Sequence, residues 1–198
     1  MMKRFSFLLF LLFLTSSLFA VTIGSVNALM STKTNAFDWK KNTRRAVGAG
    51  TGVNYQALED LTLLYPLTYG YFINLDTSLV AEVEKTKDKA EFSIDVGFSM
   101  GPTLALDGEN VYLSLSLGPA FYLGEAINNK EEEVDYFSLG LYGNAMVYLG
   151  LTPESGISLG AASYLNAFTI KDVTEGDTSF SRNYHLVPSI YIGYSTLM

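Results

Sequence analysis

Residues 92–107 read FSIDVGFSMGPTLALD. The even-numbered residues from Phe92 to Leu106 are apolar, whereas the odd-numbered residues from Ser93 to Asp107 are small, polar or acidic. A period of two is that of a β-strand, because successive side chains of a strand point to opposite faces. The stretch therefore predicts one long strand with an apolar face and a polar face. Whether the polar face meets water outside or lines an interior decides between a soluble protein and a membrane protein.

Seven further segments alternate in the same way. They span residues 21–30, 46–58, 67–83, 111–124, 137–149, 157–168 and 184–197. Most of these segments are well over the ~5–6 residues usual for soluble strands, and they reach the ~9–11 tilted residues that cross a bilayer. Their polar face carries mainly Gly, Ser, Ala, Asn and Tyr. Small side chains of this kind suit the crowded lumen of an eight-stranded barrel.

The connections between these segments alternate between short and long. Residues 107–110 and 152–156 are typical tight turns. Longer polar links span residues 31–45, 84–90, 125–134 and 172–183. Short turns at one end and long charged loops at the other are typical of membrane barrels. The sequence therefore predicts an all-β fold, an eight-stranded antiparallel up-and-down transmembrane β-barrel whose apolar face meets lipid.

Residues 1–20 have the pattern of a secretory signal peptide. The basic pair Lys3 and Arg4 precedes a mostly apolar stretch that ends at Leu14, and a more polar region follows. This apolar stretch is too short to span a bilayer as a helix. We predict that the chain is exported and reaches the outer membrane of a diderm bacterium.

We predict that cleavage follows Ala20 and leaves residues 21–198 as one barrel domain, with cleavage after Ala28 as the alternative. The chain has no cysteine, which excludes disulfides and a lipid anchor on a thiol. It has 13 basic and 20 acidic residues, a net charge of −7. An acidic chain lacks the basic surface that nucleic acids require, so we expect no nucleic-acid partner.

The signal, the eight alternating segments and the asymmetric connections resemble the small outer-membrane barrels of the OmpX, OmpW and OmpA-transmembrane-domain type. This resemblance covers the whole mature chain. It implies the bacterial outer membrane as the location, the lipid bilayer as the partner and a monomer as the oligomeric state. Such barrels usually end in an aromatic residue, whereas the last segment here reads YIGYSTLM and ends at Met198.

Polar residues of the predicted strands are candidates for a site in the lumen. They are Asn74, Asp76, Asp95, Tyr142 and Asn144. If the hairpin around residues 84–89 is symmetric, Asp76 faces position 97 and Asp95 is its diagonal neighbour. Two interpretations remain open. The carboxylates form a cation or proton site in a narrow pore, or Ser, Asn and Tyr side chains with water satisfy them inside a filled barrel.

Two of the long links carry opposite charges. The first contains Trp39, Lys40, Lys41, Arg44 and Arg45, and the third contains Glu131, Glu132 and Glu133. These residues are candidates for contact with a surface ligand or a host molecule, and ordinary solvated loops are the alternative. Trp39, the only tryptophan, is suited either to a binding hot spot or to the membrane interface.

The sequence offers little that could support catalysis. The only histidine, His185, lies at the start of the last segment. Resemblance to the lipid A deacylases among small outer-membrane barrels would require a serine two positions later, where this chain has Val187. One histidine and no cysteine are too few ligands for a transition-metal site. We therefore expect no catalytic site, no metal and no cofactor.

Three functions remain compatible with the sequence. The first is a non-enzymatic barrel with a structural or surface-interaction role through four exposed loops. The second is a narrow channel for small or apolar solutes. The third is a secreted soluble β-barrel that binds an apolar ligand, in which the two faces of every strand would be exchanged.

Overall fold

The computed structural model describes residues 21–35, 44–60, 64, 66–84, 89–127, 133–173, 178–181 and 185–197. Nearly all of these residues belong to β-strands. The strands are β1 (Val21–Asn35), β2 (Arg44–Asp60), β3 (Leu67–Glu84), β4 (Lys89–Gly108), β5 (Val111–Ile127), β6 (Glu133–Gly150), β7 (Ser155–Val173), β8 (Ser179–Ser181) and β9 (His185–Leu197). Within this part of the chain, no helix has the length and hydropathy needed to cross a membrane.

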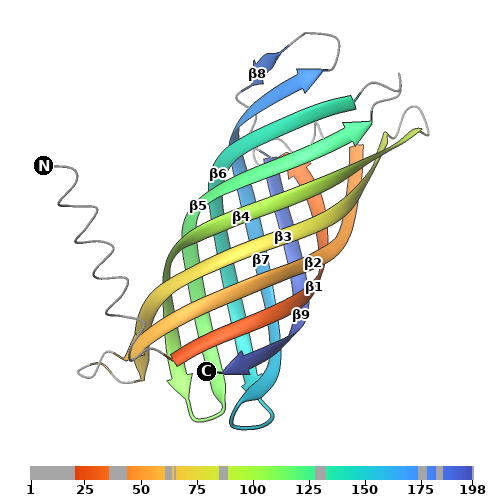
Figure 1. Cartoon of the computed structure of the whole chain (residues 1–198). Coiled ribbons are helices and arrows are strands. Elements are labelled where there is room, and N and C mark those ends of the chain that lie inside the picture. Colours follow the sequence, from red (N-terminus) through yellow and green to blue (C-terminus); the bar gives the residue numbers. More distant parts are fainter. Residues whose placement is uncertain are drawn as a thin grey trace, which may run out of the picture.

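The strands form one closed antiparallel ring (Figure 1). β1 to β7 each pair with the next strand, and β9 closes the ring by pairing with both β1 and β7. The three-residue β8 lies outside the ring and pairs with Thr169–Lys171 of β7. Closure leaves no open edge in the ring, which a lipid environment requires. The predicted eight-stranded up-and-down barrel is confirmed, and β8 is an addition within the predicted 172–183 loop.

The two ends of the barrel differ in their connections. Glu109 and Asn110 form the turn between β4 and β5, and residues 151–154 connect β6 to β7. Both turns lie at the same end of the barrel as the start of β1 and the end of β9 (Figure 1). In outer-membrane barrels, short turns face the periplasm and long loops face the outside. We call these ends the turn end and the loop end.

The alternation of the strands sends apolar side chains outward and polar ones inward. Leu115 and Ile190 are 66% and 65% exposed, whereas Ser99 and Ser158 are completely enclosed. The apolar face of residues 92–107 therefore forms part of an apolar outer belt, and the polar face lines the lumen. The alternative of a soluble barrel with an apolar interior is wrong, because that interior would require the opposite arrangement.

Strands extend into all four long links that the sequence predicts, so these links are shorter in the structure. β1 continues to Asn35 and β2 begins at Arg44, so Arg44 and Arg45 lie in a strand. β6 begins at Glu133, which also lies in a strand. The apolar pattern marks only the segment inside the bilayer. Backbone pairing continues beyond it, because charged residues at a strand end are tolerated where the ladder enters water.

A closed ladder of this kind predicts resistance to SDS. We expect the unboiled protein from the membrane fraction to migrate as a compact band and to shift after boiling. In a closed ring every strand is paired on both sides, so unfolding must break a full ladder of hydrogen bonds before any strand can leave. Gel mobility with and without boiling measures this. A protein that is soluble and whose mobility does not change on heating would contradict the membrane-barrel fold.

Candidate functional site

Aromatic side chains from different walls of the barrel meet inside the lumen. We call this cluster the upper septum, defined by Phe72 of β3, Tyr122 of β5, Tyr142 of β6 and Tyr164 of β7. The ring centroid of Tyr164 lies 4.8 Å from that of Tyr142 and 5.4 Å from that of Tyr122. Phe72 lies 5.6 Å from Tyr142. Because β3 and β7 stand on opposite sides of the ring, these contacts reach across the lumen.

A second cluster fills the lumen nearer the turn end. We call it the lower plug, and its members are Ile23, Leu58, Ala105, Tyr112, Met146 and Tyr148. Tyr112 and Tyr148 meet edge to face with ring centroids 5.8 Å apart. Tyr191 of β9 packs against both clusters. Side chains therefore close the lumen at two levels, as the small diameter of an eight-stranded barrel allows.

The two lumen carboxylates lie beside each other in the register of β3 and β4. Asp76 pairs with Gly97, and Ser78 pairs with Asp95. Asp76 and Asp95 are therefore diagonal neighbours, which is the register that a symmetric hairpin predicts. Among the buried side chains that the structure describes there is no lysine or arginine.

Neutral donors satisfy both carboxylates. Asp95, which is 1% exposed, accepts a 2.7 Å hydrogen bond from the hydroxyl of Tyr122 and another from the hydroxyl of Tyr136. Asp76 accepts hydrogen bonds from Nδ2 of Asn74 at 2.7 Å and from the hydroxyl of Tyr164 at 2.9 Å. The carboxylates thus hold two tyrosines of the upper septum, Tyr122 and Tyr164, in place. This arrangement agrees with the filled-barrel interpretation of the two aspartates.

Glycines provide the space in which these tyrosines lie. A Cβ atom added to Gly97 would lie 2.6 Å from Cζ of Tyr164, closer than real contacts allow. A Cβ on Gly124 would overlap the ring of Tyr136 in the same way. A glycine within a strand often marks such a close approach. The ring of Tyr136 therefore lies against the backbone of the strand that pairs with its own, whereas the ring of Tyr164 reaches across the lumen to the backbone of β4.

The remaining lumen candidate, Asn144, lies on β6 between Tyr142 of the upper septum and Met146 of the lower plug. Asn144 accepts a 2.8 Å hydrogen bond from the hydroxyl of Tyr191. Oδ1 of Asn54 and Oε1 of Gln56 are buried without a protein partner. Buried polar groups of this kind normally bind ordered water. The layer between the septum and the plug is therefore polar, and we expect it to be hydrated.

The structure places all five lumen candidates on the inner face of the barrel. Trp39, Lys40, Lys41, Glu131 and Glu132 lie outside the described residues, and Arg44, Arg45 and Glu133 lie at strand ends. His185 is the first residue of β9, and Val187 is buried within the upper septum cluster. Among the described residues, no three His, Cys, Asp or Glu side chains are grouped to hold a metal ion.

The sequence analysis named Tyr142 as a lumen candidate but missed the other tyrosines that pack with it. Tyr122, Tyr136 and Tyr164 occupy inward positions of their strands, as Tyr142 does. The signal available in the sequence was an excess of inward tyrosines together with inward glycines on other strands. Only the strand register shows which tyrosine lies against which glycine, so pattern alone could not pair them.

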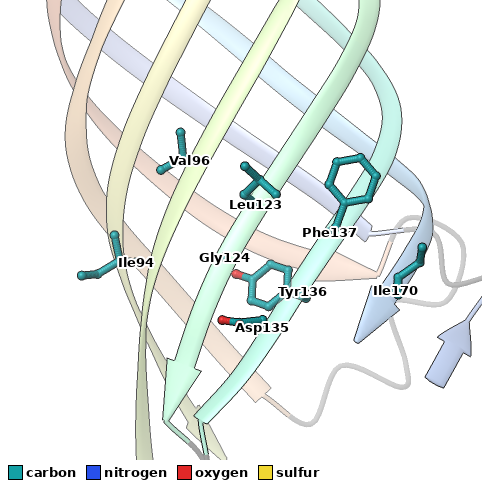
Figure 2. A pocket seen from close by; sticks show the side chains of 8 residues that line it. All are labelled: Ile94, Val96, Leu123, Gly124, Asp135, Tyr136, Phe137 and Ile170. Carbon is teal, nitrogen blue, oxygen red and sulfur yellow. The ribbon is translucent and has the colours of Figure 1, made fainter. Parts of the chain in front are cut away.

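The outer wall carries a groove near the loop end (Figure 2). Its volume is about 440 Å³, and it crosses β4, β5, β6 and β7. The lining residues are Ile94, Val96, Leu123, Gly124, Asp135, Tyr136, Phe137 and Ile170. Apart from Asp135 the lining is mainly apolar, and the hydroxyl of Tyr136 donates a hydrogen bond to Asp95 in the lumen.

No protein-family model matches the sequence, and no curated protein matches it. Solved structures do match its fold. OprG from Pseudomonas aeruginosa superimposes with a TM-score of 0.59 and 11% sequence identity, over 91% of this chain and 96% of that chain. The fold is that of a small outer-membrane β-barrel. Neisserial surface protein A gives a TM-score of 0.54 and 11% identity, over 88% of this chain and 96% of that chain.

The attachment invasion locus protein Ail of Yersinia pestis also shares this outer-membrane barrel fold. Its complex with the heparin analogue sucrose octasulfate matches with a TM-score of 0.50 and 12% identity, over 89% of this chain and 99% of that chain. The resemblance to small outer-membrane barrels that the sequence suggested is confirmed at the level of the fold. The apolar outer belt and the outer-membrane proteins that share this fold agree with the predicted outer-membrane localisation.

Proposed function

We propose that this outer-membrane barrel is a non-enzymatic protein whose lumen is closed and whose role is structural or adhesive. The observation that carries the proposal is the closure of the lumen at two levels by the upper septum and the lower plug. Hydrogen bonds to Asp95 and Asp76 hold the septum tyrosines Tyr122 and Tyr164. A barrel closed in this way offers its loop end to the outside rather than a path through the membrane.

A surface-interaction role agrees with two of the proteins that share the fold. One is a neisserial surface protein, and the other is an attachment invasion locus protein that is seen with a heparin analogue. For this chain, we propose that the contacts are made by the oppositely charged loops, with Trp39, Lys40 and Lys41 in the first and Glu131 and Glu132 in the third.

A narrow channel is the second candidate, and the acidic lumen is the observation that favours it. Asp76 and Asp95 lie within the lumen without a buried lysine or arginine among the described residues. If the septum tyrosines moved aside, these carboxylates would favour cations. The two candidates therefore differ in whether the septum opens under native conditions.

Electrical recording of the refolded protein in a planar lipid bilayer tests the closed lumen. We expect no resolved conductance steps, because close-packed rings leave no continuous water path. A general porin in the same bilayer is the positive control. Reproducible steps whose size changes in Asp76→Asn would contradict the closed lumen and establish the channel.

We also propose that the signal peptide is cleaved after Ala20 rather than after Ala28. Val21 pairs with Leu58 of β2, and Ile23 pairs with Leu197 of β9. Ile23 is 1% exposed and belongs to the lower plug. Cleavage after Ala28 would remove this part of β1 and unpair both neighbouring strands. The N-terminal sequence of the mature protein measures the site directly.

A further inference from the structure

A β-bulge in β7 changes which residues of that strand face outward near the loop end. Up to Asn166 the even-numbered residues face the lumen, and Asn166 itself is buried. The pairing register of β6 and β7 then shifts by one residue, and Ala167 has no partner on β6. Beyond the bulge Thr169 is buried, whereas Phe168 and Ile170 are exposed. Bulges re-aim side chains in this way, often at the rims of barrels.

The short strand β8 adds a third apolar side chain to this part of the outer wall (Figure 1). Phe180 of β8 pairs with Ile170 of β7. Its ring stacks on that of Phe168, with the ring centroids 6.2 Å apart and the planes inclined by 26°. Phe180 is nevertheless 68% exposed. We call Phe168, Ile170 and Phe180 the rim patch.

The rim patch is continuous with the apolar outer belt of the barrel. Phe168 pairs with Leu139 of β6, and Ile170 pairs with Phe137 of the same strand. Phe137 pairs in turn with Leu123 of β5, and both Leu123 and Leu139 are exposed on the outer wall. The outward apolar band of an outer-membrane barrel faces lipid. Pairing across three strands therefore leads directly from lipid-facing side chains to Phe180.

We propose that the rim patch inserts into the outer leaflet and holds β8 at the membrane surface. The partner is the hydrocarbon just below the lipid headgroups. Continuity with the outer belt favours lipid over a protein partner, because the paired side chains of β5 and β6 face lipid as well. Asp135 lies two residues beyond Phe137 on the outward face of β6 and is exposed. A carboxylate at this position marks the end of the hydrocarbon region, where barrels carry their aromatic girdles.

This inference changes the role of one predicted loop. The predicted 172–183 loop contains β8, so the loop is tied to the membrane at this strand. Contacts with a surface ligand are then left to other loops, in agreement with their proposed assignment to the first and third. The inference rests on the membrane placement of the barrel, and it is independent of whether the lumen conducts.

Depth-dependent quenching of tryptophan fluorescence tests the proposal. The full mature protein with Trp39→Phe, which removes the only tryptophan, carries Phe180→Trp. It is refolded into phosphatidylcholine vesicles whose acyl chains carry bromine atoms at a chosen depth. We expect bromines close to the headgroups to quench most of the emission, and bromines close to the chain ends to quench little of it.

Two reference variants in the same background calibrate the depth. Leu117→Trp lies in the middle of the outward face of β5, and we expect bromines near the chain ends to quench it. Glu109→Trp lies in the exposed turn between β4 and β5, and we expect neither position to quench it. If Phe180→Trp behaves like Glu109→Trp, the proposal is overturned and the rim patch is open to a protein partner.

Proteolysis in vesicles measures the tether without a fluorescent probe. Arg182 follows β8 directly in the sequence and is a cleavage site for trypsin. Phe180→Ser is expected to raise the rate of cleavage after Arg182 roughly tenfold, the low end for the loss of a buried large apolar side chain. Tyr194→Ser removes an exposed ring of β9 near the turn end, and it is expected to leave this rate unchanged. Equal rates for the native protein and Phe180→Ser would contradict the tether.

The placement of the barrel in the membrane is measured separately in each sample. The heat-dependent shift of gel mobility reports the folded barrel in the native protein and in every variant. A folded barrel in which Phe180→Trp is not quenched contradicts the tether alone, whereas the loss of the shift in the native protein contradicts the membrane barrel.

Discussion

Removing aromatic rings from both closed levels is expected to turn an electrically silent barrel into a cation-selective pore. The variants are Tyr142→Ala with Tyr164→Ala in the upper septum, and Tyr112→Ala with Tyr148→Ala in the lower plug. Either pair alone is expected to remain silent, because the other level still fills the lumen. The fourfold variant is expected to conduct, and the remaining Asp76 and Asp95 are expected to make the current cation-selective.

The control for this experiment is the fourfold replacement of the same tyrosines by phenylalanine. It removes the hydroxyls but keeps the rings, so we expect it to stay silent. Each buried ring replaced by alanine costs about 3–5 kcal/mol of stability, so folding is verified by the heat shift of gel mobility. If the fourfold variant does not fold, Tyr164→Ala with Tyr148→Ala opens one ring at each level. Conduction by the upper-septum variant alone would show that the lower plug does not close the lumen.

The second large effect is expected at Gly97, against which Tyr164 lies. In Gly97→Val the new Cβ would lie 2.6 Å from Cζ and 2.7 Å from the hydroxyl oxygen of Tyr164. The ring must move, which breaks its 2.9 Å hydrogen bond to Asp76 and its packing on Tyr142. Overpacking of this kind costs about 1–3 kcal/mol. Urea unfolding of the barrel in lipid vesicles measures the loss as a lower unfolding midpoint.

Gly143→Val is the matched control for this prediction. Gly143 lies on the outward face of β6, and the nearest atom to an added Cβ is Cδ1 of Leu117 at 4.0 Å. Since a β-branched residue suits a strand better than glycine, this variant is expected to be neutral or more stable by about 0.5–1 kcal/mol. Equal destabilisation by both variants would show that the inward position of Gly97 has no special role.

The strands and their faces could be predicted from the sequence because both depend on local pattern. The alternation from Phe92 to Asp107 specifies an extended segment with one apolar face, and seven repeats of that pattern specify enough strands to close a ring. Boundaries were less accurate. Charged residues such as Arg44 and Glu133 mark the end of the hydrocarbon region, whereas the backbone ladder extends beyond it.

The register of the hairpin of β3 and β4 was also predictable. In a symmetric hairpin with a short loop, residues that are equally far from the centre of the loop pair with each other. Asp76 opposite Gly97 follows from that symmetry. The partners of Asp76 and Asp95 did not follow from it. The hydroxyl of Tyr164 comes from β7, which is separated from Asp76 by many residues in sequence and by the lumen in space.

The sequence by itself thus determined that this chain forms a closed barrel with an apolar exterior, because hydrophobic alternation is a property of each strand. The tertiary structure alone decided that the ring of Tyr164 from β7 reaches across the lumen and lies against Gly97 of β4. This contact depends on the register of all the strands from β4 to β7. That register is set when the ring closes, since every strand must then pair on both sides at once.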